Sequence, residues 1–197
     1  MMAVQPLDDG RPGHVHHVVV GEVGRDLHAQ RHVPPRRVGG NLDIRDLNAG
    51  TVLYLPVEVT GALFSVGDTH AAQGDGEVCG TAVETAMDVV VRLSVRKDLR
   101  VDAPQYDLPN GALSAGSLAD RSHGIHVCTG VGPDLLEAAR DAVRATIAWL
   151  GDTHGLAREE AYAVASVGCD LRIHEVVDQL NWVVGCFVPQ SIFERDR

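Results

Sequence analysis

The chain has 197 residues and a formal charge of −10, with 27 acidic residues against 17 basic ones. This excess of acid disfavours a nucleic-acid partner or an anionic membrane surface, because phosphate contacts need clustered lysine and arginine. Hydrophobic residues make up 45% of the chain, which is typical of a globular protein. No apolar run approaches the roughly 20 residues that cross a bilayer. We therefore predict a protein that binds neither nucleic acid nor membrane.

Two further features of the sequence indicate a cytoplasmic protein. The N-terminal region lacks the apolar core of a secretory signal, since Val18-Val19-Val20 is too short for one. The four cysteines lie far apart in the chain and form no CxxC pair. A disulfide framework is therefore not predicted, and we expect reduced thiols.

Residues 1–33 differ in character from the rest of the chain. They are rich in histidine, glycine, arginine and aspartate, and they show no sustained helical or strand period. We predict a disordered or non-native leader here, with a histidine-rich metal-binding tract as the alternative. Residues 34–197 then form the folded domain.

The first half of this domain is predicted to be rich in β-structure. Apolar runs at 52–59 and 62–66 flank Thr60-Gly61, which predicts a tight hairpin. Pro56 would place the first of these strands at an edge or a bulge. The run at 87–95 alternates imperfectly, which suits a strand covered on both faces. Short strands are expected within 97–124 and at 126–129.

The second half combines helices and strands. Apolar residues at helical spacing predict a helix from Pro133 to Leu150 that ends at Gly151, and a second helix over 157–167. Closing strands are predicted at 171–177 and 182–188. The fold class is therefore α+β and β-rich, with an antiparallel sheet or sandwich-like half followed by a mixed α/β half with two helices.

The stretch with the most chemistry is Gly67-Asp-Thr-His-Ala-Ala-Gln-Gly-Asp-Gly-Glu77. A divalent metal needs oxygen ligands and an imidazole close together, and a strand through Asp68 and His70 would place both side chains on one face. Glycines 74 and 76 would let the backbone turn and bring Asp75 or Glu77 back toward this pair. The alternative is a polar hairpin turn in which Asp and Gly make the bend.

Three other polar residues are candidates on weaker local grounds. Glu84 interrupts an otherwise apolar β-run, so it either lies on a solvent face or points into a site. Asn41 and Asp43 share one face of an extended segment, and an ordinary turn is the alternative there.

Several of these segments together resemble the acetamidase/formamidase family. They are the run Gly39-Gly-Asn-Leu-Asp-Ile-Arg-Asp46, the run Leu53-Tyr-Leu-Pro-Val57 and the 67–77 stretch, joined by tail segments at 158–162, 169–172 and 182–192. The resemblance runs from about Pro34 to Phe193. It implies a metal-dependent hydrolase that cleaves the carbon–nitrogen bond of small linear amides, formamide or acetamide, and releases ammonia and a carboxylate. It also implies a homo-oligomer.

Members of that family carry a substantial portion ahead of the segment that corresponds to residues 39–46. The chain therefore resembles a C-terminal portion of such a protein, and we expect it to be truncated at the N-terminus. A catalytically inactive, metal-binding remnant of the fold is the alternative function.

The implied mechanism uses a divalent cation, zinc or calcium, to activate water and polarise the amide carbonyl. General acid–base groups would move protons to and from the nucleophile and the leaving amine. We assign Glu77 and Glu84 as the catalytic acid–base residues, with Glu84 as an alternative ligand. The predicted metal ligands are Asp68, His70 and Asp43, and the predicted substrate-binding residues are Asn41, Gln73 and Asp75.

Overall fold

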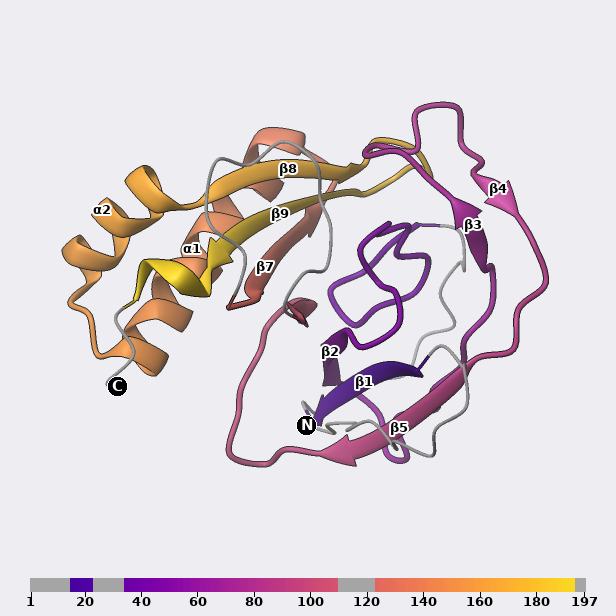
Figure 1. Cartoon of the computed structure of the whole chain (residues 1–197), viewed down its shortest axis with the longest axis horizontal. Helices are drawn as coiled ribbons and strands as arrows, with labels where there is room; N and C mark the ends of the chain where they lie inside the picture. The colour runs from indigo at the N-terminus through magenta and orange to yellow at the C-terminus, as the bar shows by residue number, and fades with distance from the viewer. Residues whose placement is uncertain (1–14, 23–33, 110–122, 194–197) are drawn as a thin grey trace.

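The structure is a computed structural model that describes residues 15–22, 34–109 and 123–193. Its main element is a seven-stranded sheet in the order β5-β1-β2-β6-β7-β9-β8, with a separate two-stranded sheet of β3 and β4 (Figure 1). β1 pairs in parallel with β2 and β5, and the remaining neighbours pair antiparallel. The strands are β1 (Val15–Glu22), β2 (Val52–Val57), β3 (His70–Ala72), β4 (Val83–Glu84), β5 (Val90–Val95), β6 (Gln105–Leu108), β7 (Ile125–Gly132), β8 (Asp170–Glu175) and β9 (Trp182–Pro189).

Two helices follow β7 in the chain, α1 (Leu135–His154) and α2 (Arg158–Gly168), and a short 3-10 helix spans Gln190–Ile192. The β-rich α+β class with two helices is therefore confirmed, as are the strands expected near 126–129, 171–177 and 182–188. Neither helix within the described ranges combines the length and apolar character needed to cross a membrane. The cytoplasmic location stays a prediction.

Helix α1 lies against the strands β7 and β9. Asp134 caps its N-terminus by accepting a hydrogen bond from the backbone N–H of Glu137 at 2.9 Å. The helix passes the predicted stop at Gly151 and ends at Gly155, whose φ of 67° provides a left-handed cap. The prediction was wrong by one turn because glycine within a helix is only mildly unfavourable. Glycine is needed at position 130 of β7 for α1 to pack closely on this strand, because a Cβ there would lie 1.9 Å from the carbonyl oxygen of Ala138.

The opposite face of the sheet holds the main hydrophobic core. Tyr106 and Val127 are fully buried there and pack with Phe187 and Val183 from β9. Ile44 joins the same cluster from the loop that precedes β2. This packing holds the neighbouring residues of that loop beside the sheet.

The predicted hairpin after β2 is wrong in its second half. A turn does form near Gly61, but residues 62–66 form no strand. Ala62 and Leu63 adopt left-handed φ values of 58° and 51°, which are incompatible with an extended strand. β2 pairs instead with β1 and β6, so Pro56 lies in an interior strand, beyond the residues that pair with β6.

The strand predicted over 87–95 is shorter and less covered than expected. β5 begins at Val90 and forms one edge of the sheet, where Val90 and Val95 are exposed. An edge strand with one exposed face has the same sequence pattern as a buried strand when its apolar residues do not alternate with polar ones. Of the region expected to hold short strands, β6 is present and residues 110–122 lie outside the described ranges.

The segment assigned to the leader supplies one described element. The backbone of β1 lies between β2 and β5 in the sheet. Residues 1–14 and 23–33 of that segment lie outside the described ranges. The division of the chain at residue 33 stays a prediction.

Candidate active site

Polar side chains from four separate segments meet at one end of the sheet. The loop before β2 contributes Asn41 and Asp43, and the segment through β3 contributes Asp68, His70 and Gln73. The following turn and β4 contribute Glu77 and Glu84, and the end of β8 with the loop after it contributes Glu175 and Asp178. Figure 1 shows how the β8–β9 end reaches the chain between β3 and β4.

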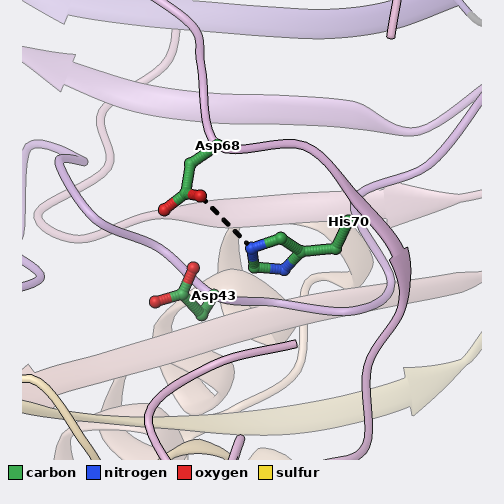
Figure 2. Close-up of side chains that lie close together, drawn as sticks. All are labelled: Asp43, Asp68 and His70. Atoms are coloured by element: carbon green, nitrogen blue, oxygen red, sulfur yellow. Dashed lines mark ion pairs between the residues drawn. The ribbon is translucent and has the colours of Figure 1, made fainter. Parts of the chain in front are cut away.

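His70 lies at the centre of the exposed half of this cluster. Its Nε2 atom is 3.0 Å from Oε2 of Glu84, the residue directly opposite it on β4, and 3.5 Å from Oδ1 of Asp68. Figure 2 shows the carboxyl groups of Asp68 and Asp43 on the same side of the imidazole ring. β3 begins only at His70, and Asp68 has a left-handed φ of 57°, so strand alternation is not what brings these two side chains together.

Three overlapping sets of side chains have the geometry of metal ligands. In each set, one potential ligand atom per residue lies within 4.8 Å of the others. His70 is common to two sets, and Asp43 joins the exposed and buried sides of the cluster. The sets are Asp43 with Asp68 and His70, His70 with Glu77 and Glu84, and Asp43 with Glu77 and Asp178.

Burial increases steadily across the cluster. The side chains of Asp68 and Glu84 are 61% and 47% exposed, and that of His70 is 11% exposed. Asp43 and Glu77 are buried, and Glu175 is fully buried behind them. Asp68 and Glu84 are therefore the solvent-facing members of the cluster, and Asp43, Glu77 and Glu175 are its buried members.

A glycine turn brings Glu77 into the cluster. The N–H of Gly76 donates to the carbonyl of His174 at 2.9 Å, and the N–H of Val176 donates back to Gly76 at 3.1 Å. Gly76 has a φ of 88°, and a Cβ there would lie 3.2 Å from Val78. The glycine turn predicted from the sequence therefore returns Glu77 toward His70.

The same turn sends Asp75 in another direction. Its carboxylate accepts hydrogen bonds of 2.6 and 3.0 Å from Arg172 on β8 and lies 3.7 Å from Arg45. Asp75 thus pairs with two arginines and belongs to none of the three metal-ligand sets. The structure does not bring it to His70.

The amide side chains of Asn41 and Gln73 hold the acidic residues in place. Nδ2 of Asn41 donates to Asp43 at 3.0 Å and to Asp178 at 2.6 Å. Nε2 of Gln73 donates to the backbone carbonyl of Asp43, and its Oε1 lies 2.9 Å from Nδ1 of His70. Both amides lie in the cluster and make hydrogen bonds within the protein, and their predicted role in substrate binding stays a prediction.

Burial of several carboxyl groups at one place shifts their pKa values. Burial and the charge of Glu77 raise the pKa of Asp43 to about 7, and burial and the charge of Asp43 raise that of Glu175 to about 9. Burial also raises the pKa of Glu77. Glu84 differs, because the backbone N–H of Ala82 lowers its pKa.

Burial lowers the pKa of His70, but the Gln73 hydrogen bond and the surrounding carboxylates, Glu84 first among them, outweigh it and raise the pKa overall. The cluster therefore favours positive charge at this ring. Arg45 and Arg172, the arginines that pair with nearby acids, reach Asp46 and Asp75 instead. A group of buried carboxylates with one imidazole is a donor set that fits a divalent cation.

Backbone strain is concentrated at the same place. Among the described non-glycine residues with left-handed φ values are Asp68 at 57°, Glu77 at 42° and Asp178 at 62°. Such conformations cost on the order of 1 kcal/mol each and persist where the surrounding structure imposes them. Three acidic members of the cluster are thus held in unfavourable conformations, which is typical of a functional site.

A hollow of about 710 Å³ opens beside the cluster. Asp68 and Glu84 form part of its wall, and Val66 and Met87 contribute apolar surface. The polar edge and the apolar wall of this open hollow lie next to each other.

Sequence reasoning missed two residues of the site. Asp178 joins Asp43 and Glu77 from the β8–β9 loop, and Glu175 accepts a hydrogen bond from the backbone N–H of Asp43 at 3.3 Å. Neither lies near the 67–77 stretch in sequence. The one available signal was an acidic residue at the end of a strand in which polar and apolar residues alternate, which also occurs at ordinary strand ends.

The chain belongs to the Acetamidase/Formamidase family, which it matches over residues 8–195. It is 30% identical over 178 residues to a formamidase from Methylophilus methylotrophus, covering 84% of this chain and 42% of that protein. It is 41% identical over 87 residues to an acetamidase from Mycolicibacterium smegmatis, covering 40% of this chain and 20% of that protein. The crystal structure of an acetamidase from Yersinia enterocolitica matches with a TM-score of 0.71 and 30% identity, covering 83% of this chain and 45% of that chain.

The resemblance predicted from the sequence motifs is therefore confirmed at the level of the family. The chain spans less than half of the length of these relatives. The family match begins at residue 8 and so includes most of the segment assigned to the leader.

Proposed function

We propose that the chain is a metal-dependent amidase that hydrolyses small linear amides to a carboxylate and ammonia. The observation that carries this proposal is the environment of His70 Nε2, which is buried without a hydrogen-bond partner and has two carboxylates within 3.5 Å. Carboxylates gathered around an imidazole nitrogen need a proton or a metal cation between them. The names of the relatives, formamidase and acetamidase, support the choice of reaction.

Asp68, His70 and Asp43 would hold the cation, as the first of the three ligand sets allows. When bound, the cation would supply Lewis-acid activation of water and of the amide carbonyl. The imidazole nitrogen is a ligand that zinc prefers, and the carboxylate oxygens are ligands that calcium prefers. We keep both metals as candidates.

The two glutamates that flank His70 would act on the attacking water and on the leaving amine. Glu77 is buried and its pKa is raised by burial, which favours a group that takes a proton from water and delivers it to the leaving amine. Glu84 is half exposed and ionised at the mouth of the site, where it would orient the attacking water. Formamide and acetamide differ by one methyl group, and we keep both as candidate substrates.

Ammonia release from formamide and acetamide, with and without a chelator, tests this proposal. We expect release that the chelator abolishes, and a loss of about a hundredfold or more for Glu77→Gln. Asp98→Asn is the matched control, because Asp98 is an exposed acid paired with Arg96 away from the site. Equal loss in the control would show general damage, and unchanged release in Glu77→Gln would refute its role.

A catalytically inactive metal-binding protein is the second candidate. Metal binding by a folded chain without ammonia release would support it. We also propose a homo-oligomer, supported by the exposed apolar residues on the edge strand β5, and its mass in solution is the test.

A further inference from the structure

Gln73 makes an unusual pair of hydrogen bonds with two of the proposed ligands. Its Nε2 atom donates to the backbone carbonyl of Asp43 at 2.5 Å, and its Oε1 atom lies 2.9 Å from Nδ1 of His70. The side chain therefore joins the loop before β2 to the first residue of β3. Both ends of the amide are used within the protein.

These contacts determine which nitrogen of His70 carries the hydrogen. A backbone carbonyl only accepts, so the NH₂ end of Gln73 must face Asp43 and the oxygen must face His70. Because an amide oxygen also only accepts, Nδ1 must be the donor. In the neutral ring, Nε2 is then the atom with the free lone pair.

The charges on the other side of the ring favour the opposite arrangement. Oε2 of Glu84 and Oδ1 of Asp68 lie 3.0 and 3.5 Å from Nε2. Both are acceptors, and both would stabilise a hydrogen on Nε2. Without Gln73, a neutral His70 would therefore place its hydrogen on Nε2 and close that position to a cation.

We propose that Gln73 is a positioning residue that holds His70 in the Nδ1–H tautomer and so presents Nε2 as a metal ligand. This inference rests on the proposed metal site. It differs from the substrate contact predicted from the sequence, since both amide atoms are already bonded. Hydrogen bonds of this kind to the second nitrogen of a ligating histidine typically change metal affinity about 10- to 100-fold.

Two variants separate the tautomer from simple packing. Gln73→Leu keeps the size of the side chain and removes the acceptor, whereas Gln73→Glu keeps the acceptor and removes the donor to Asp43. Gln105→Leu is the matched control, because Gln105 makes a similar bond, 3.2 Å to Nε2 of His126, in a different part of the sheet. The readouts are the ring ¹⁵N shifts of His70 in metal-free protein at alkaline pH and the Kd for zinc.

We expect the wild type and Gln73→Glu to show the Nδ1–H tautomer, and Gln73→Leu to shift toward Nε2–H. Zinc affinity should fall about 10- to 100-fold in Gln73→Leu, remain unchanged in Gln105→Leu, and be largely restored in Gln73→Glu. An Nε2–H tautomer in the wild type, or unchanged affinity in Gln73→Leu, would overturn the inference. If the wild type bound no zinc, and His70 still changed to the Nε2–H tautomer in Gln73→Leu, the proposed metal site would be wrong. The inference that Gln73 sets the tautomer of His70 would then be supported.

Discussion

Glu175 offers a direct test of how the buried carboxylates affect stability. It is fully buried, one of its oxygens accepts from the backbone N–H of Asp43, and the other has no hydrogen-bond partner. Burial, together with the charge of Asp43, raises its pKa from 4.5 to about 9. The folded protein therefore keeps a proton on Glu175 that the unfolded chain releases above about pH 4.5.

The sign and size of the effect follow from this difference in bound protons. Between the two pKa values the folded state holds one more proton, so the free energy of unfolding falls as pH rises, by up to about 1.4 kcal/mol per pH unit. The amide introduced by Glu175→Gln mimics the protonated acid and releases no proton. The stability of Glu175→Gln relative to the wild type should therefore rise by up to about 4 kcal/mol between pH 5 and pH 8.

Urea denaturation at pH 5, 6, 7 and 8 measures this difference, with a chelator present so that bound metal does not contribute. Titration of other groups, such as Asp43, occurs in both proteins and largely cancels in the comparison. Glu159→Gln is the control, because Glu159 is an exposed acid at the start of α2. A stability difference between Glu175→Gln and the wild type that stayed constant over this pH range would refute the reasoning.

Two further predictions concern the packing that positions the site. Gly130→Ala should destabilise the protein by about 3 kcal/mol or more in thermal or urea unfolding, because its Cβ would overlap the backbone of α1. Gly132→Ala on the same strand is the control, because a Cβ there meets nothing within 4 Å. An equal loss of stability in Gly132→Ala would show that the overlap with α1 is not the cause. Arg172→Met should cost about 2–3 kcal/mol because it leaves the buried Asp46 with only the more distant Arg45, at 4.0 Å, as an ion-pair partner, whereas Arg96→Met removes an exposed pair and should cost less than about 1 kcal/mol. Similar losses in the two arginine variants would show that burial does not decide the cost.

The sequence predicts the part of the site that is contiguous in the chain. Asp68, His70 and Glu77 lie within one stretch, and glycine at position 76 supplies the turn that brings Glu77 back. Gly76 marks that turn because few other residues adopt its φ of 88°. Local chemistry thus suffices where the chain folds back on itself within a few residues.

The remaining parts of the site depend on contacts between distant segments. Asn41 donates a hydrogen bond to Asp178, which lies 137 residues later in the sequence. Arg172 donates to Asp75, which lies 97 residues earlier. Nothing local distinguishes Asp75, which leaves the site, from Glu77, which enters it. Both outcomes are set by where the end of β8 lies, which is a property of the whole sheet.

The fold shows the same division. The two helices and the strands β7, β8 and β9 follow from apolar spacing alone. The false strand at 62–66 arose because its apolar residues resemble a strand, whereas Phe64 packs onto the core from an irregular segment that begins with left-handed residues. Tertiary packing of this kind overrides local β-propensity.

Anomalous diffraction at the zinc absorption edge, from crystals of the chain loaded with zinc, shows whether a metal ion binds at His70. We predict a peak within about 2.0–2.2 Å of Nε2 of His70, with carboxylate oxygens of Asp68 and Asp43 completing the contacts. The peak should be absent in His70→Ala. A zinc ion bound elsewhere, with the His70 position empty at saturating zinc, would contradict the account.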